Sequence, residues 1–253
     1  MKKICLGISV LALAAGIMWL CFAWKDARDI QERNKRYEQI RQKTAEEDIE
    51  FTKTQDQWII PVDFEALRKM NTDIYAWITI PGTTVDYPVL QNAEDNARYL
   101  VTDASGAESD AGAIFSEHEN ARDFSDVHTV LYGRNMDDGS MFGALHQFED
   151  DTFFEAHRVV KIYTPDAVRS YRIFAAYRYD DRHLLQSFDC SDPNVFQSYI
   201  RSIVDQRNLY ACIDKTADIQ WGDRILILST GDASGDTYRY LVQAVLIDGQ
   251  KRD

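Results

Sequence analysis

The residues best suited to chemistry lie in the stretch Ile225–Leu246, which reads ILILSTGDASGDTYRYLVQAVL. Two apolar runs separated by a Gly/Asp/Ser loop predict a strand, a loop and a second strand. Ser229 and Thr230 bring hydroxyl groups to the predicted strand end, where a nucleophile could be exposed. A hydroxyl nucleophile needs a general base beside it, and the next residue, Gly231, has no side chain at all. The function therefore depends on what surrounds Gly231.

The four cysteines, Cys5, Cys21, Cys190 and Cys212, have neither CxxC spacing nor a paired histidine. This pattern predicts no zinc site, and no other segment indicates a metal or an organic cofactor. Cys190 and Cys212 would form a disulfide if they met in an oxidising compartment, or would remain two separate thiols. The sequence does not decide between these two interpretations.

Length and charge limit the classes of function. A chain of 253 residues can hold one large domain or two small ones around a substantial core. The formal net charge of -13 argues against nucleic acid as a partner, because such binders carry a basic patch or stripe. The abundance of Tyr and Phe is typical of a β-rich domain.

The N-terminal run from Ile4 to Trp24 contains no charged residue. As a helix rising about 1.5 Å per residue, it would span roughly 30 Å, the thickness of a hydrocarbon core. It predicts a transmembrane signal anchor over residues 1–24, in contact with the membrane through residues 4–24. A cleaved signal peptide is the competing interpretation, since small residues occur around Ala12–Ala15, but the apolar run continues past them.

The rest of the chain divides into two further segments. Residues 25–57 are charged, mixed in sign and free of Gly and Pro, which predicts a solvated helical stalk and linker. Residues 58–253 form the predicted globular domain, which begins near Trp58 and has a short helix over Pro61–Met70.

Within this domain many short strands alternate with a few helices, which indicates a closed or strongly curled sheet. The predicted strands are 76–80, 83–91, 112–115, 129–132, 159–163, 171–177, 224–229 and 238–247. The predicted helices are 141–147, 151–156 and 193–204.

Five segments, in order, resemble the class B sortases, which are membrane-anchored cysteine transpeptidases of Gram-positive bacteria. They are DIYAWITIPGTTVDYPVLQ, AGAIFSE, DFSDVHTVLYGRNMDDGSMFGALHQF, YTPD and ILSTG…RYLVQAVL. The resemblance covers about residues 58–248. It implies a mainly β (α+β) fold, an eight-stranded β-barrel with peripheral helices that follows an N-terminal transmembrane helix. It also implies a single-pass cell-membrane protein with its N-terminus inside and its C-terminal domain extracytoplasmic.

The resemblance also implies a mechanism and a partner. In active members a Cys thiolate attacks a sorting-signal peptide to form an acyl-enzyme, and a His handles the protons of the amines. An Arg stabilises the oxyanion or positions the peptide. The implied partner is a sorting-signal peptide or a cell-wall protein.

This chain departs from the family at two of the three catalytic positions. Arg134 occupies the His position of the YGHNM-like motif, and Gly231 occupies the Cys position that closes a TLxTC strand. Arg239 matches the family Arg on the following strand. The resemblance further assigns Ser229, Thr230 and Asn135 to substrate binding.

Replacements for the lost groups are hard to find in the sequence. Ser229 shares strand parity with Gly231, but Arg134 cannot act as its base. His128 lies about 20 Å from position 134 along the strand, too far to replace the missing His. His146 is predicted to be a surface or packing residue. Asp232 is predicted to be a loop residue or an ion-pair partner for Arg134.

Three hypotheses follow. The first is a catalytically impaired sortase-like protein that still binds peptide or partners, with Arg134 and Arg239 forming a groove for an anionic or peptide-terminal ligand. The second is an active sortase, using an unrecognised nucleophile among Ser229, Cys190 and Cys212 or carrying an altered active-site codon. The third is a structural component of a system that attaches wall proteins.

Overall fold

The computed structural model describes residues 2–44, 60–180, 182–206, 211–232 and 235–251. The chain divides into two compact units, Met1–Lys43 and Thr44–Asp253. The predicted linker from residue 45 onward, and the predicted start of the globular domain near Trp58, lie outside the described residues.

The first unit is built by a single helix, α1, Lys2–Thr44. Its charged part carries helix-spaced pairs, including Arg28 with Glu32 at 3.6 Å and Arg41 with Glu38 at 3.2 Å. Such i,i+3 and i,i+4 pairs add a few tenths of a kcal/mol each to helix stability.

The prediction of a transmembrane anchor is wrong. A helix must present about 20 consecutive, mainly apolar residues to cross a bilayer. None of the helices in the described part of the chain is long and apolar enough to span a membrane. The predicted single-pass location with the N-terminus inside is corrected accordingly, and the predicted membrane contact through residues 4–24 stays a prediction.

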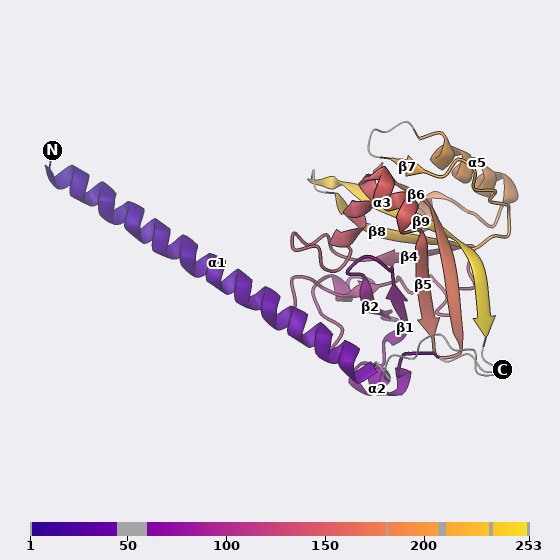
Figure 1. Ribbon diagram of the computed structural model, residues 1–253, viewed down its shortest axis with the longest axis horizontal. Helices are drawn as coiled ribbons and strands as arrows, with labels where there is room; N and C mark the ends of the chain where they lie inside the picture. The colour runs from indigo at the N-terminus through magenta and orange to yellow at the C-terminus, as the bar shows by residue number, and fades with distance from the viewer. Residues whose placement is uncertain (1, 45–59, 181, 207–210, 233–234, 252–253) are drawn as a thin grey trace. The chain divides into compact units, whose positions relative to one another are not determined.

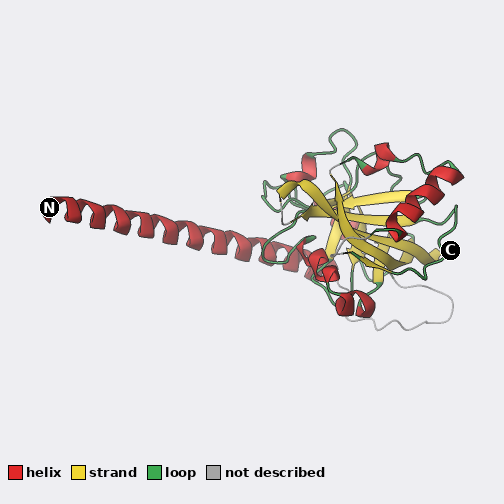
Figure 2. Cartoon of the chain, turned by 90° about the horizontal axis from the view of Figure 1, so that it is seen from above, coloured by secondary structure: helices red, strands yellow, loops and turns green. Residues whose placement is uncertain are grey.

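The second unit is organised by a mixed β-barrel (Figures 1 and 2). Its described strands are β1 Ile74–Thr79, β2 Asp86–Leu90, β3 Ile114–Phe115, β4 His128–Tyr132, β5 Val159–Thr164, β6 Ala167–Asp180, β7 Cys212–Ile213, β8 Ile225–Asp232 and β9 Gly235–Lys251. They follow the order β5-β1-β2-β3-β4-β8-β9-β6-β7, and β5 also pairs with β6. That last pairing closes every strand except β7 into a ring, which confirms the predicted eight-stranded barrel.

Two parallel contacts make the barrel mixed: β2 with β3, and β4 with β8. A parallel contact needs a long crossover. The crossover from β4 to β8 contains the hairpin of β5 and β6 and most of the helices. The other described strand pairs are antiparallel.

Short helices lie around the strands (Figure 2). They are α2 Phe64–Met70, η1 Arg98–Leu100, η2 Gly143–Glu149, α3 Asp151–Ala156, α4 Leu184–Ser187 and α5 Pro193–Val204. The predicted helix near Pro61 begins only at Phe64, because the Asp63 side chain accepts a hydrogen bond from the amide of Ala66 and caps it. Asp192 caps α5 in the same way, and Pro193 occupies its first turn.

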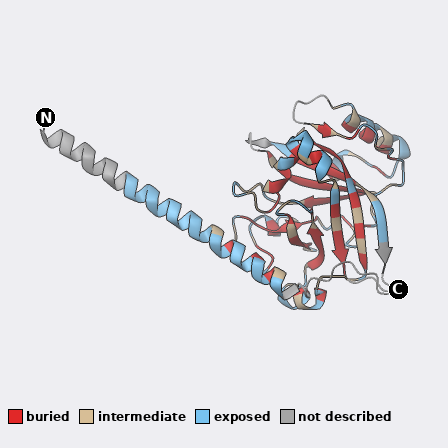
Figure 3. Cartoon of the chain, viewed as in Figure 1, coloured by how far each residue is buried: buried red, intermediate tan, exposed pale blue. Residues whose placement is uncertain are grey.

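The core runs through the barrel and beneath α5, where the buried positions follow the strands (Figure 3). On α5 the buried residues are Phe196, Tyr199, Ile200 and Ile203, spaced three to four apart as on one helix face. They pack on the barrel strands in a single apolar cluster that includes Val130.

The predicted strands are confirmed, with shifted ends. The shift that matters for the site concerns β8, which continues past the predicted end at Ser229 to Asp232, so that Gly231 is a strand residue. The two-residue strand β7 and the four-residue helix α4 were not predicted, because such short segments show no measurable periodicity.

Candidate functional site

Position 231 is fixed by the ladder between β8 and β9. Gly231 lies directly opposite Arg239, and Thr230 lies opposite Tyr240. Directly opposed residues share a face of the sheet and successive residues alternate. The Arg239 side chain and any side chain at position 231 therefore face the same way, while Tyr240 occupies the opposite face.

There is room for a side chain at position 231. Among the described residues, a Cβ atom placed on Gly231 would meet only the Cβ of Asn135, at 3.7 Å, an ordinary van der Waals contact. Asn135 is placed there by its bridge to Met141 and by the amide of Gly133, which donates to the carbonyl of Ser229 at 3.1 Å. The site thus keeps an open space where the resembling family carries its thiol.

Arg134 lies in the segment beside β8 but turns its guanidinium to a neutral backbone group. Its Nε and Nη2 atoms donate to the carbonyl oxygen of Leu100 at 3.1 and 3.0 Å. The prediction that Asp232 is a loop residue or an ion-pair partner of Arg134 is wrong in both alternatives, because Asp232 is the last residue of β8 and pairs with Arg178. The Asp232 carboxylate accepts a hydrogen bond from Arg178 Nε at 2.7 Å, and its side chain is only 2% exposed.

On the other face of the β8–β9 pair, away from the Arg239 side chain, His146 makes hydrogen bonds and stacking contacts. His146 Nε2 donates to the carbonyl oxygen of Gly231 at 3.0 Å, and Nδ1 lies 2.7 Å from Glu149 Oε1. The imidazole stacks on Tyr240, with ring centroids 4.7 Å apart and planes at 27°. His146, predicted to be a surface or packing residue, packs on Tyr240, and the prediction missed its contact with position 231, which lies 85 positions further along the chain.

The other predicted replacements are buried. Ser229 and Thr230 are 4% and 2% exposed, and the Thr230 hydroxyl has no hydrogen-bond partner among the described residues. His128 packs against Tyr199 at 4.8 Å between ring centroids. Burial lowers the pKa of His128 to about 4, so this imidazole is neutral near pH 7.

Cys190 and Cys212 are both free and buried, so the two-thiol interpretation is correct and the disulfide is absent. Burial raises the pKa of Cys190 to about 11, with the Asp189 charge adding to the effect. Burial also raises the pKa of Cys212 to about 12, helped by its hydrogen bond to Asp151 at 3.1 Å. Neither thiol has the lowered pKa of a catalytic nucleophile.

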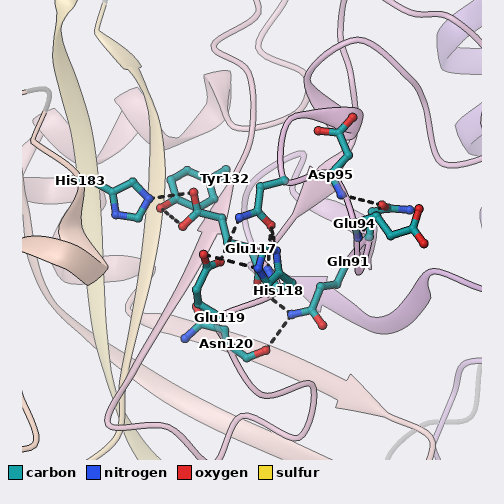
Figure 4. A network of polar contacts seen from close by, with 11 residues as sticks. Gln91, Glu94, Asp95, Glu117, His118, Glu119, Asn120, Tyr132 and His183 are labelled. Atoms are coloured by element: carbon teal, nitrogen blue, oxygen red, sulfur yellow. Dashed lines mark hydrogen bonds and ion pairs between the residues drawn. The ribbon is translucent and has the colours of Figure 1, made fainter.

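A polar network that the sequence did not indicate joins the segment before α4 to the loop between β3 and β4 (Figure 4). His183 Nε2 lies 2.9 Å from Glu117 Oε1, and the Tyr132 hydroxyl donates to Glu117 Oε2 at 3.2 Å. Burial raises the pKa of Tyr132 well above its usual value, Glu117 adds to this, and the nearby Arg239 opposes it. Because Tyr132 pairs with Ser229, the network lies on the same sheet face as Arg239.

A cleft of about 500 Å³ opens beside α5. Its wall includes Tyr179, which lies opposite Arg239 on the neighbouring strand and so shares its face. The other lining residues are Arg182, Phe188, Asn194, Val195, Ser198, Tyr199, Ser202 and Gln206. A concave surface of polar and aromatic residues thus lies beside the sheet face that Gly231 and Arg239 share.

The closed mixed barrel with a long β4-to-β8 crossover is the fold of the sortases. In the solved structure of sortase B from B. anthracis in complex with AAEK1, 29% of residues are identical, the TM-score is 0.71, and the alignment covers 87% of this chain and 99% of that one. For the Staphylococcus aureus sortase B–substrate complex the values are 28%, 0.64, 73% and 84%.

Sequence comparison narrows the class to a family. Sortase B of Listeria monocytogenes is 30% identical over 250 residues, which cover 96% of this chain and 97% of that protein. The scan against protein-family models found no match. The chain belongs to the class B sortase family.

Proposed function

We propose that this protein is a sortase-fold pseudoenzyme that binds sorting-signal peptides without carrying out transpeptidation by the family mechanism. The proposal includes the domain division, with residues 25–57 as a charged stalk and linker and residues 58–253 as the sortase-like domain. The observation that carries it is the open space at Gly231, which faces Arg239 where the family places its thiol.

The chemistry of the missing groups supports the loss of activity. Acyl transfer needs a thiolate at position 231 and a group at position 134 that can take up and release a proton near pH 7. Glycine supplies no nucleophile, and the guanidinium of Arg134 remains protonated at any physiological pH. Arg239, the retained family residue, can still orient a peptide carbonyl or carboxylate.

The alternative of an unrecognised nucleophile is disfavoured by burial and by pKa. Cys190 and Cys212 are buried thiols with raised pKa values, and Ser229 is 4% exposed. A buried thiol with a raised pKa stays protonated near pH 7 and is therefore a poor nucleophile.

Peptide binding is supported by the relatives and by the surface near the site. The staphylococcal sortase B was solved as a complex with its substrate, and that protein resembles this chain over most of the domain. The cleft beside α5 and the position 231 face give this chain a concave surface of its own for a peptide.

The test is a turnover assay with the full chain and a fluorescence-quenched form of the substrate bound in the staphylococcal complex. S. aureus sortase B serves as the active control. We expect binding to this chain but no cleavage above the protein-free rate, and cleavage well above that rate would overturn the proposal.

Labelling with a thiol-directed methanethiosulfonate reagent gives a second readout. Cys21 is free and exposed and should be modified, which makes it an internal control for the reagent. Cys190 and Cys212 should remain unmodified in the folded chain. If either buried cysteine were modified, and if added peptide prevented that modification, the result would favour the active-enzyme alternative.

A further inference from the structure

His146 places both of its ring nitrogens against hydrogen-bond acceptors. Nε2 lies 3.0 Å from the carbonyl oxygen of Gly231, and Nδ1 lies 2.7 Å from Oε1 of Glu149. A neutral imidazole carries a hydrogen on only one nitrogen, so it can donate to one of these groups and must point a lone pair at the other. An imidazolium carries both hydrogens and satisfies both contacts.

The second proton belongs to the imidazole rather than to Glu149. Imidazole is ordinarily a stronger base than a carboxylate, and Glu149 is 37% exposed, so its carboxylate remains hydrated and charged. The His146 ring also stacks on Tyr240, with centroids 4.7 Å apart, and the face of a tyrosine attracts a cation within about 6 Å. Only 20% of the His146 side chain is exposed, which limits the screening of its charge by solvent.

The surrounding groups favour a positive charge on the ring. Ionisable groups from each neighbouring element surround His146 and its contacts: Glu149 on η2, Asp150 and Asp151 at the start of α3, Cys212 on β7, Asp232 on β8, Tyr240 on β9 and Arg178 on β6. Burial raises the pKa of Tyr240, with the Glu149 charge as the next cause, and burial raises the pKa of Cys212 to about 12. Both are therefore neutral near pH 7. Arg178 donates to the Asp232 carboxylate at 2.7 Å, so the net charge of this set is negative.

The carbonyl that His146 binds lies where the β8–β9 ladder is interrupted. The register shifts between Gly231 and Asp232, as it does at a β-bulge. A bulge takes backbone groups out of regular pairing, and these groups then need other partners. His146 supplies one from η2, 85 positions away in the sequence, and so holds the strand end that carries position 231.

We propose that His146 carries a proton on both ring nitrogens in the folded protein and acts as a proton-dependent latch on the end of β8. Loss of one proton leaves a single N–H for two acceptors. The hydrogen bond to the carboxylate is charge-assisted and is the stronger of the two, so a neutral ring keeps Glu149 and releases the carbonyl of Gly231. The latch is therefore closed at acidic and neutral pH, and its contribution is lost as the pH rises.

The protonation of the ring can be measured by NMR on the full chain, isotopically labelled at the histidine ring nitrogens. We expect both nitrogens of His146 to be protonated near pH 7. His183 is an internal comparison: its Nε2 lies 2.9 Å from Glu117 Oε1, but its buried Nδ1 has no partner among the described residues, so one N–H satisfies its contacts. A bare ring nitrogen at His146 near pH 7 would overturn the proposal.

The latch itself can be measured by amide hydrogen exchange at residues 229–232. Protection is expressed relative to an unstructured chain, so that the pH dependence of the intrinsic exchange rate cancels. In the unaltered protein, protection at this strand end should fall about tenfold between about pH 6 and about pH 9, the effect of one lost hydrogen bond. Constant protection over this range would show that no such latch exists.

Two variants separate the proton from the hydrogen bonds. Glu149→Gln provides an amide that can donate to Nδ1 while Nε2 still donates to the carbonyl of Gly231, so a neutral ring makes both contacts. Protection should then no longer change with pH. His146→Phe keeps a ring against Tyr240 but removes both hydrogen bonds, and should lower protection at every pH.

Glu119→Gln is the matched control, because it changes the glutamate of an exposed His–Glu pair, His118 with Glu119 at 3.6 Å. It should leave the pH response at the end of β8 unchanged. A pH response that persists in Glu149→Gln would contradict the assignment to His146 and Glu149. If that variant fails to fold, the two measurements on the unaltered protein still decide. None of them requires peptide or turnover, so the proposed function stands or falls separately.

Discussion

The two faces of the β8–β9 ladder at position 231 differ sharply. On one face Gly231 and Arg239 border an open space, and the Arg239 side chain has no hydrogen-bond or ion-pair partner among the described residues. On the other face His146, Tyr240, Asp232 and Arg178 are tied by hydrogen bonds, stacking and an ion pair. The contacts on the face of His146 and Tyr240, called the back face, stabilise the strand pair. Residues on the face of Gly231 and Arg239, called the front face, can therefore change without loss of the fold.

The same front face is packed at its other end. His128 and Val130 precede Tyr132 on β4 and face the helix α5. The openness at position 231 is therefore local to one end of the face. Three stability measurements test this contrast, in order of decreasing effect.

The largest effect is expected from acid titration of the packed end. The pKa of His128 is about 4 in the folded chain and 6.5 in its unperturbed state, so between these pH values the unfolded chain binds a proton that the folded chain does not. Stability should be fully present above pH 6.5 and fall by roughly 3 kcal/mol as the pH drops to 4.

Denaturant unfolding of wild type and His128→Phe across this range checks the effect. The phenylalanine keeps the ring packing against Tyr199 and should remove this part of the acid sensitivity. His118→Phe, at an exposed histidine, is the control and should keep it. An unchanged acid sensitivity in His128→Phe would show that the front face is not tightly packed beneath α5.

The next effect concerns the connected back face. Asp232→Ala removes the carboxylate that Arg178 contacts, and should lower the free energy of unfolding by about 2 kcal/mol, because the Asp232 side chain is 2% exposed. Asp180→Ala breaks the exposed pair with Arg182, whose side chains are 43% and 60% exposed, and should cost less than about 0.5 kcal/mol. Equal costs for the two variants would contradict the claim that the back face holds the strand pair.

The smallest effect is expected at position 231 itself. Gly231→Ala should change the free energy of unfolding by less than about 0.5 kcal/mol, since the new Cβ meets only Asn135 among the described residues. Gly133→Ala is the matched control, because its Cβ would approach Ile114 to 2.5 Å and Phe142 to 2.7 Å, at a cost of about 2 kcal/mol. A large loss in Gly231→Ala would show that the space is not open.

The sequence predicted the barrel because its strand patterns and turn residues agree with the ordered motifs of one family. It also singled out positions 134, 231 and 239, because departures stand out within otherwise intact motifs, and the roles of these residues stay predictions. It could not predict how the departures are accommodated. Arg134 turns to a backbone carbonyl and Asp232 pairs with Arg178, which depend on loop geometry and strand register.

The contacts on the back face could not be predicted from the sequence for a similar reason. His146 reaches Gly231 across 85 positions of sequence, and no local pattern encodes such a contact. The apolar segment Ile4–Trp24 shows the opposite failure, in which a local pattern predicted a membrane span that the described helix does not support.

The most direct test of the account restores both missing groups. Peptide turnover should be measured for the full chain and for the double variant Gly231→Cys/Arg134→His, with the substrate of the staphylococcal complex. We predict no turnover above the protein-free rate for the unaltered chain and clear turnover for the double variant. Turnover by the unaltered chain, or none by a folded double variant, would contradict the claim that the groove persists while the chemistry is lost.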